Sequence, residues 1–144
     1  MNLFMESILK RREMLREWRI WVDKIATIAR SVLRDTEVYV IGSIARGNYV
    51  GGSDVDIVIV SPNIPNGALS RAGVKALIEK MLDLPYYHPF EIHLLKPEEA
   101  IRYLSRVRED VIKIEMEYTC IQYSHLLQHR FPAPYNEEVF SNQR

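Results

Sequence analysis

Two aspartates lie two residues apart at the start of an apolar run, and this spacing could hold a metal ion. Asp54 and Asp56 open a segment that continues through Val60. If the segment is a β-strand, its side chains alternate between faces, so both carboxylates leave the same face. Two neighbouring anions repel each other unless a cation lies between them. Mg²⁺ suits such a pair because it takes oxygen ligands, commonly carboxylates together with substrate phosphates.

A glycine-rich turn precedes the two aspartates. Gly42-Ser43 directly follows the β-rich run 37–41, and the loop from Gly42 to Ser53 holds four of the chain's six glycines. Backbone amides at such a turn and a serine hydroxyl can hold phosphate oxygens. Taken singly, a Gly-Ser pair is usually only a turn, and an Asp-x-Asp is usually a solvated strand start. Their occurrence together in one strand-loop-strand unit favours a site for a nucleoside triphosphate and a metal ion.

The order and spacing of these parts resemble a family signature. Gly42-Ser43, ten intervening residues and then Asp54-x-Asp56 are similar to the motif of the DNA polymerase β-like nucleotidyltransferase superfamily. The fuller string, Gly-Ser-x-Ala-Arg-Gly followed by Ser-Asp-x-Asp, resembles the minimal nucleotidyltransferase branch. That branch includes the antitoxins paired with HEPN toxins, and the aminoglycoside nucleotidyltransferases are relatives. The resemblance spans about residues 37–104; it is specific to the superfamily and says little about the substrate.

The resemblance implies a third carboxylate on a neighbouring strand. Glu91, in Phe90-Glu91-Ile92-His93, matches that position. Strand alternation places Glu91 and His93 on one face, although an edge-strand glutamate that faces water is the alternative. By resemblance, Asp54 and Asp56 are Mg²⁺ ligands, and Glu91 is a third ligand or the general base. His93 is expected to be a hydrogen-bonded neighbour rather than a ligand.

A two-metal site of this type also needs residues that hold the triphosphate. Ser43, with the amides of Gly42 and Ser43, would orient the triphosphate. Arg46 would neutralise charge on the leaving group, with an ordinary exposed loop arginine as an equal alternative. Ser53 would cap or orient the loop that carries the acids. The predicted nucleotide-binding residues are therefore Gly42, Ser43, Arg46 and Ser53.

Hydrophobic spacing predicts the elements that position these residues. We expect an α+β (α/β), nucleotidyltransferase-like fold, with a small mixed β-sheet flanked by helices on one side and a long N-terminal helix. The expected elements are one helix or two successive helices over 4–33, strands over 37–41, 54–60 and 90–95, a helix from an N-cap at Ser70 to about Leu82, a helix from Pro97 to about Val107, and a strand over 111–118, for which a helix is the alternative.

The chain divides into three predicted parts. They are an N-terminal helical extension over 1–34, a nucleotidyltransferase core over 35–118 and a C-terminal tail over 119–144. The apolar stripe of the first part docks either on the domain or on a second chain, and a homodimer through this helix follows from the second alternative. Residues 1–34 hold eight Lys and Arg against four Asp and Glu, which gives +4. A solvated helix face is the commoner meaning of such a charge run.

Composition excludes several classes of protein. The 144 residues carry 19 Lys and Arg against 19 Asp and Glu, so a globally basic nucleic-acid binder is not indicated. The sequence has no run of about 18 uncharged apolar residues and no N-terminal signal pattern, so we expect a cytoplasmic protein without a membrane span. Cys120 is the only cysteine, which excludes an internal disulfide and a multi-cysteine zinc site.

We therefore expect a Mg²⁺-dependent nucleotidyltransferase that moves AMP, or another NMP, from an NTP such as ATP to an acceptor hydroxyl. The minimal branch implies a protein acceptor, such as a tyrosine of a HEPN-type toxin, with this chain as the antitoxin. One alternative is a small-molecule enzyme of the aminoglycoside type, although such enzymes usually need a further helical domain. The other is a non-catalytic module that keeps the fold and neutralises its partner by contact.

Overall fold

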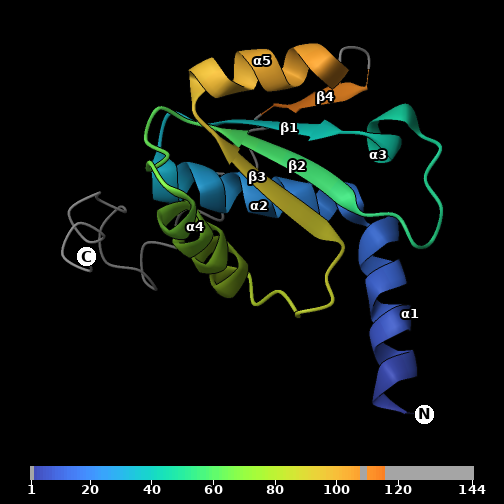
Figure 1. The fold of residues 1–144 in the computed structure, drawn as a ribbon. Coiled ribbons are helices and arrows are strands. Elements are labelled where there is room, and N and C mark those ends of the chain that lie inside the picture. Colours follow the sequence, from blue (N-terminus) through green and yellow to red (C-terminus); the bar gives the residue numbers. More distant parts are fainter. Residues whose placement is uncertain (1, 108–109, 116–144) are drawn as a thin grey trace.

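The computed structural model describes residues 2–107 and 110–115, which contain a four-stranded mixed sheet. Its strands are β1 (Glu37–Ile41), β2 (Val55–Val60), β3 (Phe90–Leu95) and β4 (Val111–Ile114), in the order β3-β2-β1-β4 (Figure 1). β1 is antiparallel to both β2 and β4, whereas β2 and β3 are parallel. The mixed α+β architecture expected from the sequence is confirmed.

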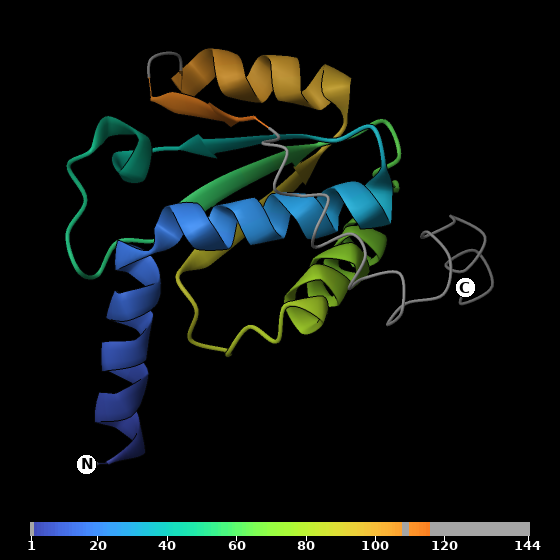
Figure 2. The same cartoon turned by 180° about the vertical axis from the view of Figure 1, so that it is seen from behind.

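Helices cover both faces of this sheet. They are α2 (Trp18–Leu33), α4 (Ala68–Met81) and α5 (Pro97–Val107). Figures 1 and 2 show α2 and α4 on one face and α5 on the other. The expectation of helices on one side was therefore wrong. In β2, Ile57 and Ile59 join the core with α2 and α4, while Val58 and Val60 pack with α5. The strand has apolar residues on both faces, and both faces are therefore covered by helices.

The N-terminal segment forms two successive helices, which is one of the two predicted forms. α1 (Leu3–Arg16) ends at Glu17, where the backbone leaves helical geometry, and α2 begins at the next residue. Val22 and Ala29 of α2 are fully buried in the core, so this part of the predicted stripe docks on the domain. α1 projects away from the sheet (Figure 1), and Phe4 near its start is 70% exposed.

The start of α4 differs from the expected position. The helix begins at Ala68 with Gly67 at the N-cap, two residues before Ser70. Gly67 has φ +87°, a conformation that glycine adopts without strain, and its carbonyl accepts a hydrogen bond from the Arg71 amide. The predicted Ser70 cap was therefore wrong, because a glycine turn makes the entry into the helix.

The C-terminal part of the chain is described as far as Glu115. Residues Val111–Ile114 form β4, so the strand rather than the alternative helix is confirmed there. The predicted continuation over 116–118 and the tail over 119–144, which includes Cys120, lie outside the described residues. Across the described ranges, we find no helix with the length and apolar character needed to cross a bilayer.

Candidate active site

Asp56 and Glu91 lie side by side because β2 and β3 are parallel and in register. Asp56 pairs with Glu91 across the two strands, and Val58 pairs with His93. Side-chain alternation therefore places Asp56, Glu91 and His93 on the sheet face that carries α5. One ligand atom from each of the three lies within 4.8 Å of the other two, which is the one such group of His, Cys, Asp and Glu in the described part of the chain. Two of the three predicted carboxylates thus come together, with an imidazole beside them.

His93 lies between the two carboxylates. Its Nε2 is 3.5 Å from Asp56 Oδ1 and 3.8 Å from Glu91 Oε1. Both distances exceed the roughly 2.7–2.9 Å of a charge-assisted hydrogen bond. The imidazole packs against the Tyr103 ring of α5, with 5.9 Å between the ring centroids. The contact with Asp56 is a hydrogen bond at the long limit of the distance range, which agrees with the hydrogen-bonded neighbour that we expected, and neither contact is short.

Tyr103 borders the site, and the sequence analysis did not anticipate it. Burial raises the pKa of its phenol, and the negative charges of Asp56 and Glu91 raise it further. A signal was present, since Ala100 and Tyr103 stand three residues apart on one face of α5 and both pack onto the sheet. Because every helix was expected on the same side of the sheet, Tyr103 was not predicted to lie beside Asp56 and Glu91.

Gly42 brings the predicted phosphate turn against Asp56. Ile41 pairs with Asp56 across β1 and β2, and Gly42 follows Ile41 directly. Gly42 has φ +78°, and a Cβ built on it would lie 3.2 Å from Asp56 Oδ2. The backbone conformation thus favours glycine, and a Cβ here would also require the Asp56 carboxylate to shift by a few tenths of an ångström. The Gly42 amide donates to the Asp110 carbonyl at 3.2 Å, so this amide is engaged within the fold rather than directed at a ligand.

Two of the other predicted nucleotide contacts, Ser43 and Arg46, follow Gly42 in a short helix, α3 (Ser43–Arg46). Ser43 is its first residue and lies one position from the glycine that contacts Asp56. Arg46 is bound to Asp110, with 2.7 Å between Nη1 and Oδ2, and its side chain is 48% exposed. The structure therefore places Ser43 next to the acidic cluster, while Arg46 joins this loop to the residue just before β4.

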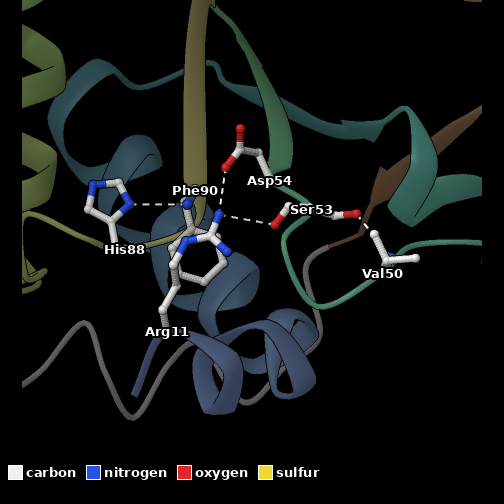
Figure 3. Close-up of polar contacts among 6 residues, drawn as sticks. All are labelled: Arg11, Val50, Ser53, Asp54, His88 and Phe90. Atoms are coloured by element: carbon white, nitrogen blue, oxygen red, sulfur yellow. Dashed lines mark hydrogen bonds and ion pairs between the residues drawn. The ribbon is translucent and has the colours of Figure 1, made fainter. Parts of the chain in front are cut away.

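Asp54 lies outside the cluster and contacts the N-terminal helix instead. Its Oδ1 accepts a hydrogen bond from Arg11 Nη2 at 2.6 Å, and its side chain is 59% exposed (Figure 3). Strand alternation predicted that Asp54 would share a face with Asp56, but β2 begins only at Val55. Because Asp54 precedes the strand, its side chain does not have to follow the strand's period. The expected set of three carboxylates therefore divides, with Asp54 paired to Arg11.

Ser53 organises the loop just before the acids. Its Oγ accepts a hydrogen bond from the Val50 amide at 3.0 Å, and its own amide donates to the Val50 carbonyl at 2.9 Å (Figure 3). Its carbonyl accepts from Arg11 Nη2 at 3.1 Å. Arg11 belongs to the charged run of residues 1–34, and nothing in its local spacing indicates this contact across 42 positions.

The donor set fits a divalent cation. Asp56 and Glu91 supply carboxylate oxygens, which suit Mg²⁺, and both are partly accessible, with side chains 33% and 52% exposed. Solvent and phosphate oxygens could therefore complete the coordination. An imidazole also lies within reach, and that ligand suits transition metals.

A family model, a curated relative and a solved structure are similar to this chain. A family model described as a nucleotidyltransferase domain matches residues 22–124, which is well over half of the chain. A curated relative, the poly(A) RNA polymerase cid12 of Schizosaccharomyces pombe, is 32% identical over 80 residues, which make up 56% of this chain. The chain spans 23% of the length of that relative. A crystal structure from Sulfolobus solfataricus, of a protein assigned as a nucleotidyltransferase, is 23% identical, covers 76% of this chain and 83% of its own, and has a TM-score of 0.46.

Proposed function

Because this chain belongs to the nucleotidyltransferase domain family, we propose that it transfers AMP from ATP to an acceptor hydroxyl with the help of a divalent cation, Mg²⁺ in the simplest case. The transferase class follows from the family. The nucleotide, the metal ion, the acceptor and the roles of individual residues are our proposal.

The observation that carries the proposal is the contact between three segments at one end of the sheet. Asp56 of β2 pairs with Glu91 of β3, and the Gly42 turn after β1 approaches Asp56 so closely that a Cβ would meet its carboxylate. Carboxylates beside a turn with a serine are the arrangement that a metal-bound triphosphate requires.

Each residue has a role that follows from its position. Asp56 and Glu91 would hold the cation, which when bound offsets the negative charge of the phosphates and of the reacting oxygens. Glu91, whose side chain is 52% exposed, is also accessible enough to accept the proton of an incoming hydroxyl. Ser43 would donate its hydroxyl to a phosphate oxygen. Asp54 would serve as a further ligand only after leaving Arg11, and Arg46 and Ser53 would hold the loop in place.

We propose a protein acceptor, on the basis of the resemblance to the minimal branch whose members include antitoxins of HEPN toxins. The exposed apolar end of α1, which includes Leu3 and Phe4, would then contact the partner or a second copy of the chain. A cytoplasmic location belongs to the same proposal. The name of the Schizosaccharomyces pombe relative, a poly(A) RNA polymerase, adds the 3′ hydroxyl of an RNA as a second acceptor to be tested.

The experiment that tests this function follows the nucleotide. The purified chain is mixed with ATP labelled at the α-phosphate, a divalent cation and one acceptor at a time: a co-purified partner protein, an RNA oligonucleotide or a hydroxylated small molecule. We expect label on the protein partner. Label on RNA or on the small molecule would redirect the acceptor assignment and leave the transfer reaction intact.

Substitutions at the two carboxylates test whether Asp56 and Glu91 are needed for the transfer reaction. Asp56→Asn and Glu91→Gln should each lower the labelling rate at least about a hundredfold, since both remove charge that the cation requires. Asp35→Asn is the matched control, because Asp35 is exposed and precedes β1, whereas Gly42 follows that strand at its other end. Labelling that survives both substitutions, or that falls equally in the control, would overturn the proposed site.

A further inference from the structure

We infer that His93 is a direct ligand of the divalent cation and makes the site favour Mn²⁺ over Mg²⁺ more than its carboxylates alone would. The inference rests on the cation site of the proposed function and identifies the ion that this site selects. It depends on the positions of Asp56, Glu91 and His93 on two neighbouring strands.

Two of the three separations within the cluster are compatible with ligands around a common centre. With metal–ligand bonds of about 2.1 Å, two ligand atoms of an octahedral ion lie about 3.0 Å apart when adjacent and about 4.2 Å apart when opposite. His93 Nε2 lies 3.5 Å from Asp56 Oδ1 and 3.8 Å from Glu91 Oε1, which is within this interval. The third separation, between Asp56 and Glu91, is within 4.8 Å, so side-chain rotations that bring the three ligand atoms within about 4.2 Å of one another would place one ion among them.

At these distances His93 makes no short, charge-assisted hydrogen bond with either carboxylate. His93 stays at 3.5 Å or more from both, although the side chains of His93 and Asp56 are only 28% and 33% exposed. Tyr103 packs against the imidazole, with 5.9 Å between the ring centroids.

The chemistry of the donor set indicates the ion. Asp54 is bound to Arg11, so the described ligands near Asp56 are one further carboxylate and one imidazole. Mg²⁺ takes oxygen ligands and gains little from an imidazole, whereas first-row transition ions bind imidazole better, with Mn²⁺ the weakest of the series. Mn²⁺ is the transition ion that still accepts carboxylate, phosphate and water oxygens, so it matches the mixed set.

Metal binding can be measured without any nucleotide or acceptor. The metal-free chain is titrated with Mn²⁺ alone and with Mg²⁺ alone by calorimetry, and the Mn²⁺ complex is examined by pulsed electron paramagnetic resonance. We expect a nitrogen-14 coupling that shows an imidazole bound to Mn²⁺. A Mn²⁺ complex of the unaltered chain without this coupling would overturn the inference, whatever the variants do.

Two histidine variants separate coordination from packing. His93→Gln should remove the nitrogen coupling and weaken Mn²⁺ binding about tenfold, while Mg²⁺ binding changes less than about twofold. His88→Gln is the matched control: His88 faces Glu79 and accepts a hydrogen bond from the Phe90 amide, a bond that a glutamine oxygen can also accept. An equal loss of Mn²⁺ and Mg²⁺ affinity in His93→Gln would assign His93 a structural role only.

The outcome also distinguishes this inference from the proposed function. Nitrogen-coupled Mn²⁺ with no transfer of labelled AMP would support His93 as a ligand and contradict the enzyme. Transfer that depends on Asp56, with no nitrogen coupling, would support the enzyme and contradict His93 as a ligand.

Discussion

Arg11 Nη2 lies 2.6 Å from Asp54 Oδ1 and joins the projecting helix α1 to the loop that leads into β2. The same nitrogen donates to the Ser53 carbonyl at 3.1 Å. Asp54 is 59% exposed, so the ion pair contributes only about 0–1 kcal/mol to folding stability. The ion pair instead determines where the Asp54 carboxylate lies. It keeps this carboxylate against α1 and away from the cluster that contains Asp56.

Removing the Arg11 side-chain charge should therefore strengthen cation binding. In Arg11→Gln, Asp54 loses its guanidinium partner and becomes available to a divalent ion near Asp56. We expect the affinity for Mn²⁺ to rise about two- to fivefold, with a change of less than about 1 kcal/mol in the free energy of unfolding. Calorimetry and urea denaturation measure the two quantities.

Lys10→Gln is the control for this change. Lys10 is the exposed neighbour of Arg11 on α1, and its substitution removes the same charge from the helix. A similar rise in affinity in both variants would mean that general charge, and not the contact with Asp54, controls the site.

Gly42→Ala and Gly47→Ala together test the close approach of the turn to Asp56. The two glycines have nearly equal φ values, +78° and +77°, but only a Cβ at Gly42 meets another group, Asp56 Oδ2 at 3.2 Å. Alanine at Gly47, which has the αL conformation with ψ 13°, should cost about 1–2 kcal/mol of stability, and alanine at Gly42, whose ψ of −149° lies in a region essentially restricted to glycine, should cost more. Only Gly42→Ala should also lower divalent-cation affinity and nucleotidyl transfer. Equal losses of transfer activity in the two variants would show that strain, and not the displaced carboxylate, is responsible.

Short-range patterns predicted much of the fold. The apolar run with Asp54 and Asp56 gave a strand, and alternation in 90–95 placed Glu91 and His93 on one face. These predictions succeed because strand alternation is a local geometric rule. The position of the Asp54 side chain was harder to predict, because it depends on where the strand begins and on an arginine 43 residues away.

The placement of α5 shows a second limit. A helix starting at Pro97 can be predicted from its own residues, but the side of the sheet on which it packs is decided by the strand beneath it. The run Ile57–Val60 is apolar at consecutive positions, which is typical of a strand covered on both faces. This run therefore predicts helices on both faces of the sheet. A helix on the face that carries His93 is what brings Tyr103 beside it.

Glu99→Gln should destabilise the junction between α4 and α5. Arg71 of α4 donates two hydrogen bonds of 2.7 Å to the Glu99 carboxylate, and it also donates to the carbonyls of Pro65 and Leu94. Arg71 holds the pKa of Glu99 below its usual value. Because both side chains are partly exposed, we expect a loss of about 1–2 kcal/mol in the free energy of unfolding at neutral pH. Glu98→Gln, one residue earlier in the same exposed first turn, should change it by less than about 0.5 kcal/mol.

The raised pKa of Tyr39 predicts that the folded chain loses stability in alkaline solution. Burial, followed by the hydrogen bond that its hydroxyl donates to Glu37, raises the pKa of Tyr39 from 10.0 to about 12. Between these values the unfolded chain has released the phenolic proton and the folded chain retains it, so the free energy of unfolding falls as the pH rises through this window. Tyr39→Phe removes the proton and should flatten this part of the profile.

Urea denaturation at about pH 9 and about pH 11 measures the effect, and the difference between the two proteins cancels the other groups that titrate there. Tyr49→Phe is the matched control, because Tyr49 lies in the loop after α3 and is 38% exposed. The control should keep the alkaline slope of the unaltered chain. If Tyr39→Phe also keeps that slope, the phenol does not retain its proton in the folded state, and the contact with Glu37 is not maintained in solution.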